Sequence, residues 1–331
     1  MTSQGDPADD RDPSAASPHS APIPHFEVAL AAPDLAAWQA GNTGLAGVTS
    51  FTAAAPGPHV VLMALTHGNE IAGAIVLDRL LRTGLRPARG RLTFGFANLA
   101  AFAVFDPAQP TTSRFVDEDL NRVWDMSVLD GHRRSVELDR ARALRGLLDT
   151  ADILLDLHSM LWPSEPLILC GSTQRGAALA RTIGVPALVV ADRGHLSGLR
   201  MIDYGRFAEA RSSATAVLIE AGQHWQANTV TTMAASVDAL LGHAGMIDGP
   251  LVPAADDSRL FEVTDLVTAA TSSFAFVRAF HGGEVVPRRN TVIALDGDAE
   301  IRTPYDNCLL VMPSLRSGRG HTAVRLARRV G

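Results

Sequence analysis

The feature that most constrains the fold is a regular alternation of apolar runs and helical patterns through the first 245 residues. The strand-like runs at 59–65, 91–97, 151–158 and 214–220 are apolar almost throughout. Strands that alternate with helices are joined by crossovers, which align them in parallel, and helices on both faces of the sheet explain strands without a polar side. The sequence therefore predicts an α/β fold with a mostly parallel or mixed central sheet flanked by helices.

The pattern changes after Gly249-Pro250, where short alternating runs are separated by turn sequences such as HGG and DGD. Such runs are typical of small antiparallel sheets. We predict a larger α/β domain at 25–248 and a smaller β-rich domain at 249–331. Residues 1–24 are rich in Pro, Ser, Ala and Asp and contain no apolar stretch, which predicts a disordered N-terminal tail rather than a signal peptide.

Composition excludes several classes of protein. The net charge is −6, aromatic residues make up 5%, and no basic run occurs, so a nucleic-acid partner is not expected. Every one of the 29 basic residues is Arg, which excludes a Schiff-base or Walker lysine. No apolar run is long enough to span a membrane. The two cysteines, Cys170 and Cys308, lie far apart and fit a reducing cytoplasm.

Titratable residues stand at the ends of three predicted strands. His67 and Glu70 follow the run at 59–65, His158 ends the run at 151–158, and Glu220 ends the run at 214–220. The carboxyl ends of parallel strands meet at one edge of a sheet, where ligands bind. We therefore expect these four side chains to converge.

The same His-x-x-Glu spacing recurs at His281 and Glu284. That pair lies in a Gly-Gly hairpin of the β-rich domain, and no third His is placed to join it. We interpret the second pair as a turn.

Two His and one carboxylate match a catalytic zinc site, which leaves one coordination position open to water. His67, Glu70 and His158 are the predicted zinc ligands, with one zinc ion per chain. Zinc lowers the pKa of bound water from about 15.7 to about 7, and a carboxylate that is not a ligand must then accept the proton. Glu220 is the candidate for this role. The alternatives are that His158 is a buried structural histidine and that Glu220 caps a helix or forms an ion pair.

A polar segment, RFVDEDLNRVW at 114–124, lies between the first two ligands and His158. Arg114 can stabilise a developing oxyanion. Asn121 and Arg122 can bind a substrate carboxylate, because a guanidinium group matches a carboxylate with two hydrogen bonds. A surface loop with local salt bridges is the alternative.

Four motifs, LTHGNE, SRFVDEDLNRVW, LLDLHS and LIEAG, resemble in order and spacing the succinylglutamate desuccinylase and aspartoacylase family, a branch of the zinc carboxypeptidase-like fold. The resemblance extends from about residue 27 through the β-rich domain. It implies a zinc-dependent hydrolase that cleaves an amide into a carboxylic acid and an amino compound. It also implies the roles given above for the ligands, Glu220, Arg114, Asn121 and Arg122, and a supporting role behind the ligands for Asp119.

Other substrate contacts are less marked in the sequence. The segment between His158 and Glu220 lacks the Tyr and Arg expected at matching offsets in aspartoacylase itself. We predict that Tyr204 and Arg206 bind substrate from this segment and that Tyr305 reaches the site from the β-rich domain. Other cations there, Arg200 among them, can instead supply a second positive group or be solvated. Further candidates are His224 and Trp225, for which the alternative is a packed aromatic.

The predicted function is removal of an acyl group from a small N-acyl amino acid that carries a carboxylate. A metallocarboxypeptidase acting on peptides is the alternative within enzymes, and a non-catalytic binding module that kept the fold is the alternative outside them. The sequence leaves open the acyl group, the amino compound and the oligomeric state, for which a homo-oligomer is one possibility.

Overall fold

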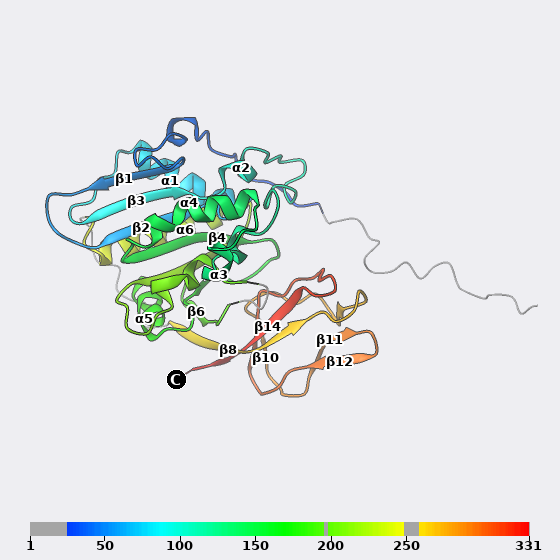
Figure 1. Cartoon of the computed structure of the whole chain (residues 1–331). Helices are drawn as coiled ribbons and strands as arrows, with labels where there is room; N and C mark the ends of the chain where they lie inside the picture. Colours follow the sequence, from blue (N-terminus) through cyan, green and yellow to red (C-terminus); the bar gives the residue numbers. More distant parts are fainter. Residues whose placement is uncertain (1–24, 195–197, 248–257, 331) are drawn as a thin grey trace, which may run out of the picture.

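A computed structural model describes residues 25–194, 198–247 and 258–330 of the chain (Figure 1). The predicted tail at 1–24 and the predicted boundary between residues 248 and 249 lie outside the described residues. Both remain predictions.

One mixed sheet of eleven strands organises the described residues (Figure 1). In spatial order the strands are β1 (Val48–Thr52), β3 (Arg91–Phe96), β2 (His59–Ala64), β4 (Ile153–Met160), β7 (Thr215–Gln223), β5 (Leu167–Leu169), β6 (Leu188–Ala191), β8 (Arg259–Thr268), β14 (Thr322–Arg329), β13 (Cys308–Val311) and β10 (Val285–Val286). The parallel centre of the sheet is formed by β3, β2, β4 and β7, and the pairs β5–β6 and β6–β8 are also parallel. The pairs β1–β3, β5–β7, β8–β14, β13–β14 and β10–β13 are antiparallel. The predicted mixed α/β sheet is confirmed.

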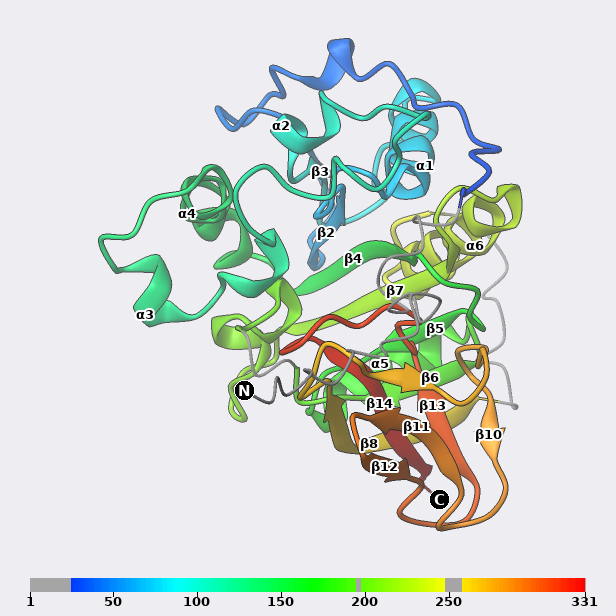
Figure 2. The ribbon, with the colours of Figure 1, turned by 90° about the vertical axis from the view of Figure 1, so that its right-hand side faces the viewer.

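A second, smaller sheet lies in the C-terminal part of the chain and is antiparallel, as predicted. It consists of β12 (Ala299–Arg302), β11 (Val292–Asp296) and β9 (Ala275–Phe276). The C-terminal residues do not form only this sheet. β8 pairs with β6, so β8, β14, β13 and β10 extend the large sheet beyond the helix-flanked part (Figure 2).

Helices cover both faces of the parallel strands. The longer helices are α1 (Ile71–Arg82), α4 (Val136–Leu148), α5 (Gln174–Ile183) and α6 (Ala227–His243). In β2, Val60 and Leu62 belong to the core cluster that includes residues of α1, α5 and α6, whereas Val61 and Met63 belong to the cluster that includes α4. This division follows from the alternation of side chains along a strand. Short segments are α2 (Leu99–Phe102), α3 (Met126–Leu129) and the 3-10 turns η1 (Ala36–Trp38), η2 (Leu120–Arg122), η3 (Met201–Asp203) and η4 (Gly205–Phe207).

Parallel pairing brings the carboxyl ends of β2, β4 and β7 to one edge. Val60 in β2 is paired with Ile153 in β4, and His158 near the end of β4 is paired with Glu220 in β7. The chain leaves β2 through Leu65, whose φ of 58° is a left-handed conformation that a Leu residue rarely adopts. The segment with His67 and Glu70 therefore begins in a strained turn at this edge.

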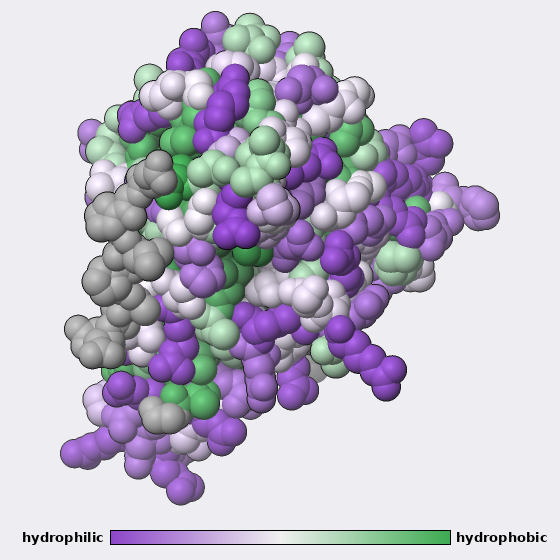
Figure 3. Space-filling model, turned by 90° about the vertical axis from the view of Figure 1, so that its left-hand side faces the viewer, coloured by the Kyte–Doolittle hydropathy of each residue, from purple (hydrophilic) through white to green (hydrophobic). Residues whose placement is uncertain are grey.

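The surface drawn in Figure 3 is a mixture of hydrophilic and hydrophobic residues. Within 25–194, 198–247 and 258–330, no helix is long and apolar enough to span a bilayer.

The close approach of α1 to the sheet depends on Gly73. A Cβ atom at this position would lie 3.0 Å from the Cβ of Ala64 and 3.1 Å from the Cβ of Leu157. We expect Gly73→Val to lower the free energy of unfolding by about 1–3 kcal/mol, because overpacking forces strand and helix apart. Chemical denaturation measures this change.

Gly146 in α4 is the matched control, because a Cβ atom there would meet nothing within 4 Å. Gly146→Val should leave stability unchanged or raise it slightly, since Gly is a poor helix former. Equal effects of the two substitutions would contradict the packing argument.

Candidate active site

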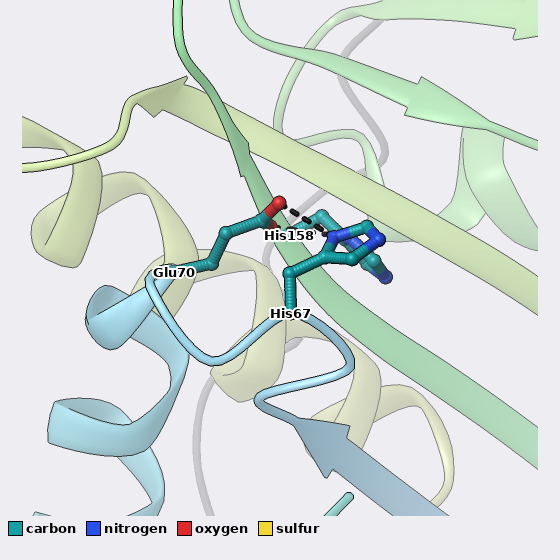
Figure 4. A group of neighbouring side chains, drawn as sticks. All are labelled: His67, Glu70 and His158. Carbon is teal, nitrogen blue, oxygen red and sulfur yellow. Dashed lines mark hydrogen bonds and ion pairs between the residues drawn. The ribbon is translucent and has the colours of Figure 1, made fainter. Parts of the chain in front are cut away.

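Three buried side chains form a compact group at the strand edge. His67 and Glu70 come from the segment between β2 and α1, and His158 comes from β4 (Figure 4). One potential ligand atom from each residue lies within 4.8 Å of the others, and each residue is no more than 3% exposed. The carboxylate of Glu70 lies between the rings, with Oε1 2.7 Å from Nδ1 of His67 and Oε2 3.1 Å from Nδ1 of His158.

The second nitrogen of each ring is held by an aspartate. Nε2 of His67 lies 2.9 Å from Oδ1 of Asp119, and Nε2 of His158 lies 2.8 Å from Oδ2 of Asp156. Asp156 also accepts a hydrogen bond of 2.8 Å from Thr66 Oγ1. A ligand histidine in proteins commonly donates its other N–H to a carboxylate, which fixes the ring and raises its basicity. The residues present therefore fit a zinc ion bound by two His and one carboxylate.

The charge on Glu70 suits this role. Burial opposes its ionisation, but the adjacent His67 and His158 hold the pKa of the carboxyl well below its usual range. Glu70 is thus a carboxylate anion, the form that binds a cation. Its Oε2 also accepts a hydrogen bond of 2.9 Å from the backbone N–H of Ser159, which fixes the carboxylate in place.

Glu220 lies beside this group on the neighbouring strand. It is buried, and its Oε2 has no hydrogen-bond partner among the described residues. Burial, together with the negative charge of Glu70, raises the pKa of Glu220 to about 8. A carboxyl group with a pKa near neutrality can both accept and donate a proton, as general acid–base catalysis requires.

A cavity of about 310 Å³ opens in front of these residues. Seven residues predicted from the sequence to act in the site line this cavity together: His67, Glu70, Arg114, Asn121, Arg122, His158 and Glu220. His224, a further candidate, lines it as well. Trp225 does not line the cavity. It is fully buried, and its indole N–H donates to the backbone oxygen of Asn69 over 3.0 Å.

Arg114 reaches the ligand group from the segment before η2. Its Nη1 donates to Oε1 of Glu70 over 3.3 Å, and its Nη2 donates to Oδ2 of Asp119 over 3.2 Å. The backbone oxygen of Arg114 accepts a hydrogen bond of 3.1 Å from Gly68 N–H, which joins this segment to the ligand segment. The guanidinium group of Arg114 therefore lies beside the predicted metal position.

Asn121 and Arg122 form the wall next to Arg114. Asn121 is buried, and its Oδ1 accepts a hydrogen bond of 2.8 Å from the backbone N–H of Met201. Burial and the nearby guanidinium groups of Arg114, Arg325 and Arg200 lower the pKa of Arg122 to about 10. An anionic ligand at Arg122 would relieve this repulsion between like charges.

A buried carboxylate fixes the segment that carries these residues. Glu137 in α4 accepts hydrogen bonds from the backbone N–H groups of Val116, Asp117 and Glu118 over 2.7, 3.0 and 3.2 Å. It also accepts one of 3.0 Å from Nδ2 of Asn98, the N-cap residue of α2. Burial opposes the charge, but these donors lower the pKa of Glu137 below its usual value.

The helix is capped in return by the same segment. The backbone N–H of Val136 donates to Oδ2 of Asp117 over 2.7 Å, and Ser135 Oγ donates to Oε1 of Glu118 over 2.5 Å. Segment 116–118 and the start of α4 are thus fixed to each other by hydrogen bonds in both directions. The sequence alone gave no specific signal for this arrangement, because a Glu in the first turn of a helix is common.

Further cavity residues come from parts of the chain that the motifs do not cover. Arg200 is one of several cations between His158 and Glu220, and Arg325 in β14 lies outside all four motifs. Asp192 joins them, with Oδ2 3.1 Å from Nη1 of Arg200 and 3.1 Å from Nε of Arg325. An arginine within the apolar run of β14 was the available signal. Met312, Pro313 and Ser314, which follow β13, also line the cavity.

The structure does not bring Tyr204, Arg206 and Tyr305 to the cavity. Tyr204 is buried against Trp124, and its hydroxyl donates to Oδ1 of Asp149 over 2.7 Å. Arg206 donates to the backbone oxygen of Asp149 near the opposite ends of the strands. The hydroxyl of Tyr305 lies 2.7 Å from Oγ1 of Thr264. Each side chain is held elsewhere by a local partner, so none of the three lines the cavity as expected, and their role in substrate binding stays a prediction.

The second His-x-x-Glu pair, His281 and Glu284, does not line the cavity. Glu284 forms an ion pair with Arg278, and its backbone N–H donates to the oxygen of His281 over 3.1 Å. This arrangement agrees with the interpretation of the pair as a turn.

Comparison with known proteins identifies relatives. Residues 56–244 match the succinylglutamate desuccinylase/aspartoacylase catalytic domain. Aspartoacylase of Xenopus tropicalis is 31% identical over 113 residues, which are 31% of this chain and 34% of that protein. Mouse aspartoacylase is 28% identical over 121 residues, or 34% and 37% of the two chains. These matches span only about a third of the relatives' length.

Solved structures share the fold over most of the chain. Succinylglutamate desuccinylase from Vibrio cholerae is 22% identical with a TM-score of 0.68, and the match covers 87% of this chain and 86% of that one. A succinylglutamate desuccinylase/aspartoacylase from Rhodobacter sphaeroides is 21% identical with a TM-score of 0.65, covering 86% and 89%. At these identities the likeness establishes the fold.

Glu137 provides a test of how the arginine-bearing segment is held. In Glu137→Gln an NH₂ group replaces one oxygen, so it faces backbone donors and leaves them without an acceptor. We expect the free energy of unfolding to fall by about 1–3 kcal/mol. The control is Glu209→Gln at an exposed position, which should change stability by less than about 0.5 kcal/mol. A similarly small effect at Glu137 would contradict the assignment.

Proposed function

Because the chain belongs to the succinylglutamate desuccinylase/aspartoacylase family, we propose that it is a zinc-dependent hydrolase that removes the acyl group from an N-acyl amino acid or a related amide. One observation carries the proposal. The buried group of His67, Glu70 and His158 and the unpaired carboxyl oxygen of Glu220 line the same cavity. A set of metal ligands and a separate proton acceptor at one cavity are what the metal-dependent hydrolysis of an amide requires, and this supports the proposal.

When bound by His67, Glu70 and His158, zinc would supply a Lewis acid and lower the pKa of a bound water. Glu220 then has two tasks. Its free Oε2 accepts the proton of the attacking water and later donates that proton to the leaving nitrogen. The raised pKa of Glu220 supports both steps, because a strong acid would release the proton to the nitrogen but would not accept it from water.

Arg114 is the proposed stabiliser of the carbonyl oxygen. Its guanidinium group lies against Glu70 and Asp119, so it is held in place before substrate arrives. A positioned donor of this kind contributes about 2.7–4 kcal/mol when negative charge develops on the oxygen. Asn121 and Arg122 bind the substrate carboxylate next to it, and the positive charge gathered around Arg122 supports this assignment.

One zinc ion per chain follows from the single group of potential ligands found among the described residues. The substrate is a small molecule, as the size of the cavity suggests. A reducing cytoplasm remains the proposed compartment, supported by the two free buried cysteines.

Glu220 allows the proton-transfer role to be tested. Glu220→Gln keeps the shape of the side chain but cannot accept a proton, so we expect kcat for N-acyl amino acids to fall about 10²–10⁴-fold. Zinc content should be unchanged, because Glu220 is not a ligand in this proposal. Steady-state kinetics and metal analysis measure the two quantities. Full activity in this variant would refute the assigned mechanism.

The ligand set is tested by metal analysis. The purified protein should contain about one zinc per chain, and removal of zinc with a chelator should abolish amide hydrolysis. His158→Ala should lose stoichiometric zinc, because two ligands remain. His132→Ala, at an exposed position, is the control and should retain the metal. Full zinc occupancy in His158→Ala would show that the ion binds elsewhere.

A further inference from the structure

His224 lines the cavity but has no part in the mechanism proposed above. It directly follows β7, and only 2% of the residue is exposed. Its backbone N–H donates to the oxygen of Met160 over 2.9 Å, and its ring packs against Trp225 with centroids 5.1 Å apart. The imidazole ring is therefore held in one position at the wall of the cavity.

A β-bulge in β7 precedes His224. The pairing of β7 with β4 shifts register between His158 and Met160, where β7 contains one extra residue. Gly222 lies in this bulge with a φ of 134°, and a Cβ atom there would be 2.9 Å from Oγ1 of Thr229. Bulges often occur next to active sites, where they redirect side chains. Here the bulge sets the position of His224 relative to the end of β4.

Ser159 in β4 links His224 to the ligand group. Its Oγ lies 2.8 Å from Nδ1 of His224, and its backbone N–H donates to Oε2 of Glu70 over 2.9 Å. Arg114 instead donates to the other oxygen of Glu70, Oε1, over 3.3 Å. His224 and Arg114 are thus connected to the ligand group through different oxygens of one carboxylate.

The contact with Ser159 determines which ring nitrogen of His224 carries the proton. Burial lowers the pKa of His224 to about 4, so at neutral pH the ring is uncharged and has one N–H. With the proton on Nδ1, both the hydroxyl hydrogen of Ser159 and Nε2 would lack a partner among the described residues. With the proton on Nε2, the hydroxyl donates to Nδ1 and only the Nε2–H group lacks one. The second tautomer satisfies more of these buried groups and is favoured.

The Nε2–H group is then left for a ligand in the cavity, because no described residue accepts a hydrogen bond from it. In the proposed function the scissile carbonyl lies at Arg114, and the substrate carboxylate lies next to it at Asn121 and Arg122. The acyl group therefore extends toward the other side of the ligand group, where Ser159 and His224 are.

We propose that His224 binds the substrate by donating a hydrogen bond from Nε2 to an oxygen of the acyl group. This inference rests on the proposed function and adds a substrate-binding residue that lies outside the four sequence motifs. The acceptor is either the scissile carbonyl oxygen or an oxygen further along the acyl group. Proton transfer remains the task of Glu220.

Two substitutions separate substrate binding from a purely structural role. Asn has a polar atom near the position of Nδ1, so His224→Asn keeps a partner for Ser159 but has no atom at the position of Nε2. Gln is longer, so His224→Gln places its amide NH₂ near the position of Nε2. We expect kcat/KM to fall at least about tenfold in His224→Asn, and kcat/KM in His224→Gln should be at least about threefold higher than in His224→Asn.

The zinc-loaded proteins are assayed with N-acetylaspartate, N-acetylleucine and N-succinylglutamate. A loss in kcat assigns the acceptor to the scissile carbonyl oxygen, whereas a rise in KM alone assigns it to an oxygen further along the acyl group. An unchanged kcat/KM in His224→Asn, or a value in His224→Gln no higher than in His224→Asn, would overturn the inference and leave the proposed function intact. Hydrolysis of none of the three by the unaltered protein would contradict the proposed function, and the inference with it.

His243→Asn makes the same substitution at an exposed position, the last residue of α6, and should leave kcat/KM unchanged. Metal analysis of the same proteins should find about one zinc per chain in His224→Asn, because the ligands are unchanged. Loss of zinc in that variant would show that His224 supports the ligand group instead of binding substrate, and would overturn the inference.

Nuclear magnetic resonance gives a readout independent of turnover. In the zinc-loaded Glu220→Gln protein with nitrogen-15-labelled histidine, the ring signals of His224 are those that disappear when His224→Asn is added. They should show an uncharged ring with the proton on Nε2, and the Nε2 signal should shift when the best of the three substrates is added. A proton on Nδ1, or an Nε2 signal that does not respond to substrate, would contradict the inference.

Discussion

The parallel pairing of β2, β4 and β7 is the constraint on which the rest of the site depends. It places the carboxyl end of β2 beside that of β4 and sets His158 directly opposite Glu220. A slip of one residue in either pairing would turn these side chains to the other face of the sheet. The buried apolar residues on both faces of β2 and β4 fix the register, and so the hydrophobic core determines the geometry of the polar group.

That polar group is stable because each member has a counterpart. Glu70 lies between two imidazole rings, and each ring has an aspartate on its far side. Burying so many titratable groups would be costly in isolation, but paired charges and hydrogen bonds offset the loss of water. Glu220 is the exception: one of its oxygens is buried without a partner among the described residues. An incompletely satisfied carboxyl beside a satisfied ligand group is the arrangement expected of a proton carrier.

The cavity is completed by segments that are separate from the parallel strands. Glu137 holds the segment that carries Arg114 and Arg122 against α4 by accepting three consecutive backbone N–H groups. The C-terminal residues approach from the other side, because β8 pairs with β6 and carries β14 and β13 onto the large sheet. Arg325 and Met312 reach the cavity in this way. The C-terminal part of the chain thus forms a wall of the site in addition to its own small sheet.

The sequence alone determined the elements and the chemistry of the central group. Apolar runs bounded by polar residues predicted the strands, and the position of His67, Glu70, His158 and Glu220 at strand ends predicted their convergence, because parallel strands share an edge. Only the tertiary structure decided which distant residues complete the cavity. Tyr204, Arg206 and Tyr305 are polar residues in suitable segments, yet local partners hold them elsewhere. Arg325 and Met312 have no local motif, since their place depends on long-range pairing of β8 with β6, which periodicity along the chain does not encode.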